Sequence, residues 1–398
     1  MQHTLPSSTR AVGRSEVSPA SAFATCAGAD EWAATIVQEV LTATYWFDSG
    51  EHGRPYSALI KFSGRRIGVT GKPQPRDYFS QVETVEGIVP GSGPVSITTR
   101  VFRINPGEWM ISAEPVSRNG GAGVVRSYPW SHHGGPRSVK PAFWYWRKPA
   151  MSIGSARPVK TGLFAFARIP GVIPGAWPTL VALGVLVGLA VQAMLVARAH
   201  LEVGAVLVVS LVASAAGLVG AKAWYLTLHQ RTWRAVTSEG MCIQGFLVGA
   251  VLVGTAALTF AHLPVGTFLD ATAPGLFFGM AIGRHGCFFG GCCAGRATAS
   301  RWGMWASDRR VGVRRVPTQL LESLACLAIG FATLVLILHH RPPVAGAAFV
   351  GAVAAYTLWR QVLLSLRAEP RKTSMGRPLT MAVAALVLAA GILLYSAA

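Results

Sequence analysis

The sequence contains few charged residues for its length, and those of negative sign are the scarcest. Only 13% of the 398 residues are charged, whereas 51% are hydrophobic, a balance that excludes an ordinary soluble protein of this size. The 17 acidic residues face 36 lysines and arginines, which gives a formal net charge of +19. We therefore expect an integral membrane protein whose basic side chains meet anionic head groups or a phosphate-bearing substrate.

Cysteine and targeting signals are scarce as well. Six unevenly placed cysteines are too few for a disulfide framework.

The basic residues lie mostly beside apolar segments and no nucleic-acid-binding motif occurs, so we expect no nucleic-acid partner. Residues 1–29 are rich in Ser, Ala, Thr and Pro and lack the apolar core of a signal peptide. This composition predicts a disordered tail over residues 1–29.

The next segment, residues 30–116, has the pattern of a small all-β domain. Short alternating runs separated by Gly, Pro and Asn predict an antiparallel, immunoglobulin-like sandwich. The runs cover residues 56–62, 66–70, 79–85, 95–104 and 108–115. Residues 117–178 are rich in Pro, Gly, Arg and aromatic residues, which predicts an extended linker near the lipid head groups.

Residues 179–398 contain apolar runs of bilayer length. We count seven: 180–196, 203–228, 241–261, 268–282, 320–338, 344–364 and 379–396. The fold class predicted from this pattern is an α-helical integral membrane protein, a bundle of about seven transmembrane helices preceded by the all-β domain. With seven spans, the N-terminal domain and the second, fourth and sixth loops share one side. These loops are rich in basic residues, whereas the opposite loops hold little more than Arg198 and Arg341, which favours the cytoplasm for the first side.

The first candidate site lies in the stretch from Asp270 to Glu322. Arg284 follows an apolar helix at the start of a glycine-rich segment, and an arginine held near lipid usually faces a polar cavity. The alternative interpretation is that Arg284 lies at the membrane interface and only reaches toward the head groups. We expect Gly283, Gly290 and Gly291 to let the backbone approach the ligand of Arg284.

Two further groups of residues could complete that site. Gln319 and Glu322, three residues apart, share one helical face, as do Tyr356 and Arg360, four residues apart in a later apolar run. A charge so deep in an apolar run needs a partner, and either a lipid phosphate or a buried acid such as Glu322 could serve Arg360. Arg367 follows at the membrane border, where it could recruit lipid or simply anchor the helix.

The order of these residues resembles the prolipoprotein diacylglyceryl transferase family, from about residue 178 onward. The matching positions are Asp270, Pro274, Gly279, Gly283-Arg284, Gly290-Gly291, Pro317-Thr318-Gln319-Leu320, Glu322, Tyr356-Thr357-Leu358-Trp359-Arg360 and Leu366-Arg367. The resemblance implies seven spans in the bacterial plasma membrane, with the N-terminus outside, opposite to the charge distribution. We leave the sidedness open, with a weak preference for a cytoplasmic N-terminal domain.

The resemblance also implies a reaction. The family moves a diacylglyceryl group from phosphatidylglycerol to a cysteine thiol of a lipoprotein precursor, with no cofactor. Arg284 and Arg360 match essential arginines that would stabilise the phosphate leaving group. We expect Asp270, Gln319 and Glu322 to orient these arginines, because carboxylates facing guanidinium groups are poor bases.

Gln244 is the main departure from the family pattern, because the family has a histidine there that is thought to act as base on the thiol. Glutamine cannot accept a proton, although a cysteine thiol is partly ionised without help. Two alternatives therefore stay open: a non-catalytic phospholipid-binding relative, acting as a scaffold or lipid sensor, and transfer to another acceptor. His285 could replace the base or be a packing residue.

A cluster of cysteines, Cys287, Cys292 and Cys293, raises the question of a metal. The sequence offers no matching pair of ligands elsewhere, and adjacent cysteines rarely both bind one ion. We therefore predict no metal and interpret the cysteines as small residues that allow a tightly packed turn. A covalent or redox role for Cys292 or Cys293 stays open.

Overall fold

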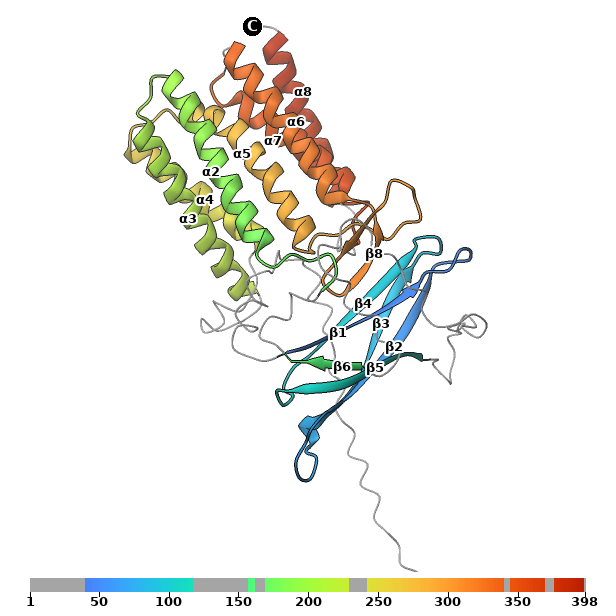
Figure 1. Ribbon diagram of the computed structural model, residues 1–398. Helices are drawn as coiled ribbons and strands as arrows, with labels where there is room; N and C mark the ends of the chain where they lie inside the picture. The colour runs from blue at the N-terminus through green and yellow to red at the C-terminus, as the bar shows by residue number, and fades with distance from the viewer. Residues whose placement is uncertain are drawn as a thin grey trace, which may run out of the picture.

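The computed structural model describes residues 40–116, 157–161, 169–228, 242–339, 344–368 and 376–396. Within these ranges a β-rich part lies against one end of a bundle of helices (Figure 1). The predicted tail, residues 1–29, and most of the predicted linker, residues 117–178, lie outside the described residues.

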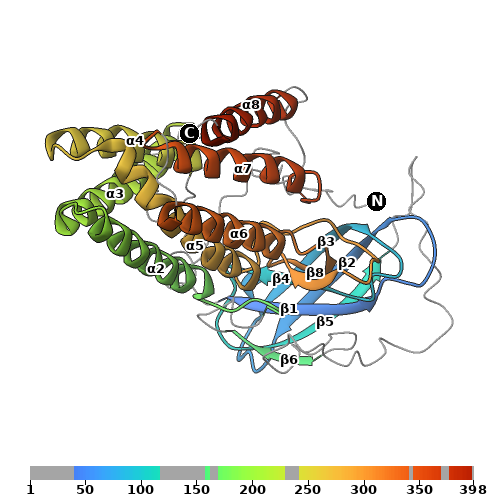
Figure 2. The same cartoon turned by 90° about the horizontal axis from the view of Figure 1, so that it is seen from above.

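The β-rich part consists of two antiparallel four-stranded sheets around one core. One sheet has the order β1 (Leu41–Asp48), β4 (Pro94–Val101), β8 (Val311–Arg315), β7 (Met304–Ser307), and the other β3 (Tyr78–Ile88), β2 (Tyr56–Arg66), β5 (Glu108–Val116), β6 (Arg157–Lys160). Leu41 and Ile97 from the first sheet meet Phe62 and Trp109 from the second, and all four are fully buried. We call β1 to β8 the two-sheet region (Figure 2).

Comparison with the sequence pattern shows agreement in the middle of this region and differences at its edges. Strands β2, β3, β4 and β5 cover predicted runs, but residues 67–70 are not a strand and β1 was not among the predicted runs. Strands β6, β7 and β8 come from outside residues 30–116. An immunoglobulin-like topology stays a prediction.

Seven helices among the described residues coincide with the seven predicted apolar runs. They are α2 (Ala176–Arg198), α3 (Val203–Leu228), α4 (Ile243–Phe260), α5 (Val265–Phe289), α6 (Thr318–His339), α7 (Ala347–Leu363) and α8 (Gly376–Ser396). Five of them, α2, α3, α5, α6 and α8, are long and apolar enough to cross a membrane, whereas α4 and α7 are shorter. The protein is therefore a multi-pass membrane protein, and passage of α4 and α7 through the bilayer stays a prediction.

Helix α5 packs against α2, α6 and α7, and glycines set its distance from α2. A Cβ added to Gly184 would lie 2.5 Å from the carbonyl oxygen of Gly279, and one added to Gly275 would lie 2.3 Å from that of Gly188. Such a contact admits only glycine, so the two backbones touch, as in other closely packed membrane helices. This crossing fixes the helix that carries Arg284.

The hairpin β7–β8 joins the helices to the two-sheet region (Figure 1). It lies in the chain between α5 and α6, yet β8 pairs with β4 through Ser96 and Ile97. The Trp305 indole nitrogen donates to the Pro94 carbonyl oxygen at 3.0 Å, and its ring stacks on Trp46. The loop after α7 reaches the same end, because Arg367 forms a bridge with Gly295. The hairpin after α5 and the loop after α7 therefore meet the N-terminal strands at one end of the helices, and the predicted common membrane side of these segments stays a prediction.

Candidate functional site

Glu322 is the centre of the candidate site. Its side chain on α6 is fully buried, and three arginines surround its carboxylate. Arg284 Nη2 and Arg360 Nη1 each lie 2.7 Å from Oε1, and Arg367 Nη2 lies 2.8 Å from Oε2. The predicted convergence of Arg284 and Arg360 is therefore present, and it occurs on the buried acid that we considered as the structural partner of Arg360.

Tyr356 belongs to the same cluster. Its hydroxyl donates to Glu322 Oε1 at 2.6 Å and accepts from Arg284 Nη2 and Arg360 Nη1, each at 3.3 Å. Its ring packs edge-on against Phe277 of α5. The hydroxyl thus links two helices that each supply one arginine.

The cluster carries more positive than negative charge. Three guanidinium groups around one carboxylate leave a formal charge of +2. Arg367 is almost fully buried and its Nε lacks an acceptor among the described residues, whereas the Arg360 side chain is 33% exposed. Buried donors are normally satisfied and buried charge is normally balanced, so the site is suited to receive an anion.

The described contacts of Asp270 do not include the arginines, and its expected role in orienting them stays a prediction. Its carboxylate on α5 accepts from the backbone N–H of Gly346 at 2.7 Å and of Phe349 at 3.1 Å, so it caps the N-terminus of α7. Asp270 and Gly346 each precede an arginine of the cluster by fourteen residues, about 21 Å along a helix. The cap thus sets the register of two parallel helices at the far end from Glu322.

Gln319 contacts the turn before α6, and its expected role in orienting an arginine stays a prediction. Its side-chain N–H donates to the Cys292 carbonyl oxygen at 2.8 Å, and the Thr318 hydroxyl donates to the Cys293 carbonyl oxygen at 3.3 Å. Both contacts hold the turn that follows α5. Gln319 therefore supports the turn.

The glycines near Arg284 face protein. Arg284 lies within α5, which continues past the predicted run 268–282 to Phe289. Gly283 faces Val181 of α2, and a Cβ on Gly290 would lie 2.7 Å from the Gly286 carbonyl oxygen. Gly291 has φ +67° and lies against Ser307 and Arg309 of the β7–β8 hairpin. These glycines permit close helix and hairpin packing, and their expected approach to a ligand stays a prediction.

Gln244 is exposed near the start of α4. Its side-chain carbonyl accepts from the Cys242 thiol at 2.6 Å, a contact within the same helix start. The described contacts therefore do not bring Gln244 into the Glu322 cluster. Its predicted catalytic role stays a prediction.

His285 fits the packing interpretation. Its Nδ1 lies 3.0 Å from the Ala281 carbonyl oxygen, to which the Ser323 hydroxyl also donates. The Ser323 hydroxyl also lies 3.3 Å from Nδ1. The Ala281 contact ties His285 to its own helix.

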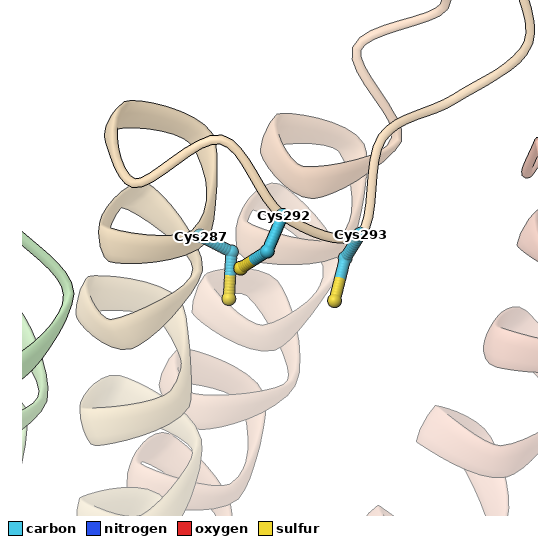
Figure 3. Close-up of side chains that lie close together, drawn as sticks. All are labelled: Cys287, Cys292 and Cys293. Atoms are coloured by element: carbon cyan, nitrogen blue, oxygen red, sulfur yellow. The ribbon is translucent and has the colours of Figure 1, made fainter. Parts of the chain in front are cut away.

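The three cysteines after Arg284 lie closer together than the sequence indicated. The Sγ atoms of Cys287, Cys292 and Cys293 lie within 4.8 Å of one another (Figure 3). Cys287 also contacts the cluster around Glu322, because Arg284 Nη1 lies 4.0 Å from its Sγ. Among the described residues, this group combines the spacing and the ligand type that a thiophilic metal needs.

The sequence predicted that Glu322 orients Arg284 and Arg360, but it did not predict that three arginines contact its carboxylate. A signal was available, since Asp270 and Glu322 are the two acidic residues within the seven helices. Acidic residues inside apolar helices need a partner. Asp270 accepts hydrogen bonds from the N-terminus of α7, and Glu322 forms ion pairs with three arginines.

Comparison with known proteins agrees with this site. Residues 169–396 match the model of the prolipoprotein diacylglyceryl transferase family. Relatives named phosphatidylglycerol–prolipoprotein diacylglyceryl transferase include one from Dehalococcoides mccartyi, 30% identical over 41% of this chain and 65% of the relative. Another, from Clostridioides difficile, is 26% identical over 51% of this chain and 81% of the relative. A Streptomyces coelicolor relative, with the same name followed by the number 2, is 28% identical over 58% of this chain and 74% of its own.

The matched segment spans slightly less than two thirds of the Dehalococcoides relative and more of the other two. The family match covers more than half of this chain and includes all seven helices, the β7–β8 hairpin and the Glu322 cluster. The two-sheet strands β1 to β6 precede it. On this evidence the chain belongs to the prolipoprotein diacylglyceryl transferase family.

Proposed function

We propose that the protein transfers a diacylglyceryl group from phosphatidylglycerol to a cysteine thiol of a lipoprotein precursor, in a bacterial plasma membrane. The observation that carries this proposal is the meeting of Arg284 and Arg360 at Glu322 Oε1, each at 2.7 Å. The names of the relatives support the same donor and acceptor.

In this reaction the acceptor sulfur attacks the glyceryl carbon that bears the phosphate ester. The carbon–oxygen bond to phosphate breaks, a thioether forms, and glycerol phosphate leaves as an anion with the electron pair. The thiol gives up its proton to water. Negative charge grows on the phosphate in the transition state, so fixed guanidinium groups in a site of low dielectric constant are the main catalytic device. Arginine suits this task because its planar fork can hold two phosphate oxygens and keeps its proton.

Glu322 is proposed to position the arginines. Its carboxylate accepts from Tyr356 and contacts three guanidinium groups, so it has little capacity left to act as a base. Removing all three cations from water without a counter-charge would be costly. One carboxylate lowers that cost and still leaves an excess of positive charge for phosphate.

The acceptor side of the reaction lacks the family base. Gln244 cannot take the proton of a thiol, but a few per cent of a cysteine thiol is ionised near neutral pH. We therefore propose slow transfer limited by thiol ionisation.

A second candidate function is phospholipid binding without lipoprotein modification, as a scaffold or lipid sensor. The observation that favours it is Gln244, whose carbonyl group is engaged by Cys242. In that case the arginines would hold a head group and no thioether would form.

The test is a transfer assay on the full-length protein in phosphatidylglycerol vesicles, with a precursor peptide that contains one cysteine. Thioether formation is followed by the mass of the peptide. We expect product with the wild type and a loss of about 10²-fold or more with Arg284→Ala, by analogy with the loss of one charge-stabilising donor. The matched control is Arg198→Ala, at the exposed end of α2. Absence of product from the wild type, with phosphatidylglycerol still bound, would favour the second function.

A further inference from the structure

The three cysteines Cys287, Cys292 and Cys293, which we call the thiol cluster, form a group that the proposed transfer does not use. Cys287 lies in the last turn of α5 and the other two follow in the turn after it. Their sulfur atoms point to the same side of that turn (Figure 3). All three lie within 4.8 Å of one another.

The backbone at Cys293 has an uncommon conformation. Cys293 has φ +56°, in the left-handed region that few residues other than glycine adopt. The side chains of Cys292 and Cys293 lie on the same side of the turn (Figure 3), whereas two extended neighbours would point apart. A non-glycine residue in the left-handed region carries local strain that the surroundings must hold.

The surroundings hold the turn at three points. The Cys292 backbone N–H donates to the Cys287 carbonyl oxygen at 3.0 Å. Gln319 and Thr318 donate to the carbonyl oxygens of Cys292 and Cys293. The thiol cluster is therefore pre-organised by α6, which also carries Glu322.

We propose that the thiol cluster binds one soft d¹⁰ cation, Cu(I), through three thiolates. Thiolate sulfur selects Cu(I) and Zn(II) over harder ions. At a metal–sulfur distance of about 2.3 Å, three sulfurs in a trigonal plane lie roughly 4 Å apart. The sulfur positions need to contract by less than about 1 Å to reach that geometry.

The number of ligands favours Cu(I) over Zn(II). Structural zinc sites take four ligands. Among the described residues, the group of potential metal ligands at this place contains only the three cysteines. His285, the nearest histidine in sequence, has its Nδ1 at the Ala281 carbonyl oxygen. Three thiolates around Cu(I) form a complete coordination shell without a fourth residue.

Charge is compatible with a metal thiolate at this place. Three thiolates and one monovalent cation carry a net negative charge, opposite in sign to the Glu322 cluster. Arg284 connects the two, since its Nη2 contacts Glu322 at 2.7 Å and its Nη1 lies 4.0 Å from Cys287 Sγ. Metal binding displaces the protons of the three thiols. Cys292 is partly exposed and gives the ion a route of entry.

The test is metal binding by the purified full-length protein in detergent, under reducing conditions and without lipid substrate. Cu(I) is titrated against the chelator bathocuproine disulfonate, and bound metal is measured by mass spectrometry of the elements. We expect one Cu(I) per chain and an affinity that rises with pH, because each thiol must lose a proton. Cys292→Ser and Cys287→Ser should each weaken binding by at least about tenfold, as even changes around a ligand do.

Cys242→Ser is the matched control, because Cys242 is a partly exposed cysteine outside the thiol cluster; it should retain one Cu(I) per chain. Size-exclusion profiles identify variants that fail to fold, and the wild-type stoichiometry alone still decides the proposal. Absence of stoichiometric Cu(I) in the wild type, or equal affinity in all variants, would overturn the site. One Zn(II) per chain that resists Cu(I) and is lost in Cys292→Ser would overturn the choice of a monovalent ion. None of these outcomes depends on transfer activity.

Discussion

At the scale of single residues, the site depends on one carboxylate that several cations share. The sequence predicted that Arg284 and Arg360 meet, through their place in a family pattern and their depth in apolar runs. It did not predict the partners of Asp270 and Gln319, because these contacts join residues that are distant in the chain. Such contacts produce no pattern in the local sequence. Residue type told which side chains need a partner, and only the packed structure tells which partner each one has.

Glu322→Gln tests this arrangement through stability. The change leaves three guanidinium groups without their counter-charge, and removal of one member of a buried ion pair costs about 3–5 kcal/mol. We expect a large fall in the thermal unfolding temperature in detergent. Glu114→Gln is the control, because the Glu114 side chain is 64% exposed and pairs only loosely with Lys61. Equal unfolding temperatures for the two variants would contradict the central place of Glu322.

Gln244→His tests whether a lost base limits transfer. A histidine near its usual pKa can accept the thiol proton, and general base catalysis contributes roughly 10²–10⁴-fold. We expect the rate of thioether formation in the peptide assay to rise within that range, with a dependence on pH around 6.5. Gln244→Asn, which has no basic group, should behave as the wild type. A Gln244→His rate equal to the wild type would place the limiting step elsewhere.

At the scale of elements, two helices carry the arginines and two kinds of contact set their positions. The Asp270 cap fixes the start of α7 against α5, and glycines fix α5 against α2. The apolar runs predicted the helices to within a few residues, except that α5 extends to Phe289, seven residues beyond the run 268–282. Glycine lowers helix propensity, but close packing against α2 outweighs that preference.

Gly279→Ala tests the crossing of α2 and α5. The new Cβ would lie 2.7 Å from the Gly184 carbonyl oxygen, and such overpacking costs roughly 1–3 kcal/mol. We expect a lower unfolding temperature. Gly351→Ala in α7 is the matched control, because no atom lies within 4 Å of the added Cβ and alanine is the better helix former. A Gly279→Ala variant as stable as Gly351→Ala would show that the helices are not in backbone contact.

Asp77 gives the two-sheet region a dependence on pH. The hydrogen bond from the Asn105 side chain, followed by that from the Gln74 backbone, lowers the Asp77 pKa, and Arg66 adds to the effect. A carboxyl with a lowered pKa contributes stability that is present above its unfolded pKa, about 3.9, and that is lost as the pH falls through the folded value.

We therefore expect the unfolding temperature of the full chain, followed by tryptophan fluorescence, to fall below about pH 4. Asp77→Asn should reduce this dependence on pH, whereas Glu114→Gln should leave it unchanged. An Asp77→Asn variant with the full wild-type dependence would assign the acid sensitivity to other groups.

At the scale of the whole molecule, the two-sheet region and the helices form one structure. Strands β7 and β8 leave the membrane bundle between α5 and α6 and complete a sheet that begins at β1 (Figure 2). The sequence predicted a separate β domain because strand pairing between distant segments has no signature in either segment. The short runs of β7 and β8 are also weak strand signals, four and five residues long. Because this hairpin follows α5, the N-terminal strands are attached to the end of the helix that carries Arg284.

The whole arrangement places an excess of positive charge where a lipid head group can meet it. The most direct measurement is native mass spectrometry of the full-length protein with equal amounts of phosphatidylglycerol and phosphatidylcholine of the same acyl chains. Hydrogen bonds to charged groups contribute roughly 1.5–3 kcal/mol each, about tenfold or more in affinity. We predict preferential retention of phosphatidylglycerol by the wild type and by Arg198→Ala, and a loss of that preference in Arg284→Ala and Arg360→Ala. Equal preference in all four proteins would contradict the assignment of the Glu322 cluster as the head-group site.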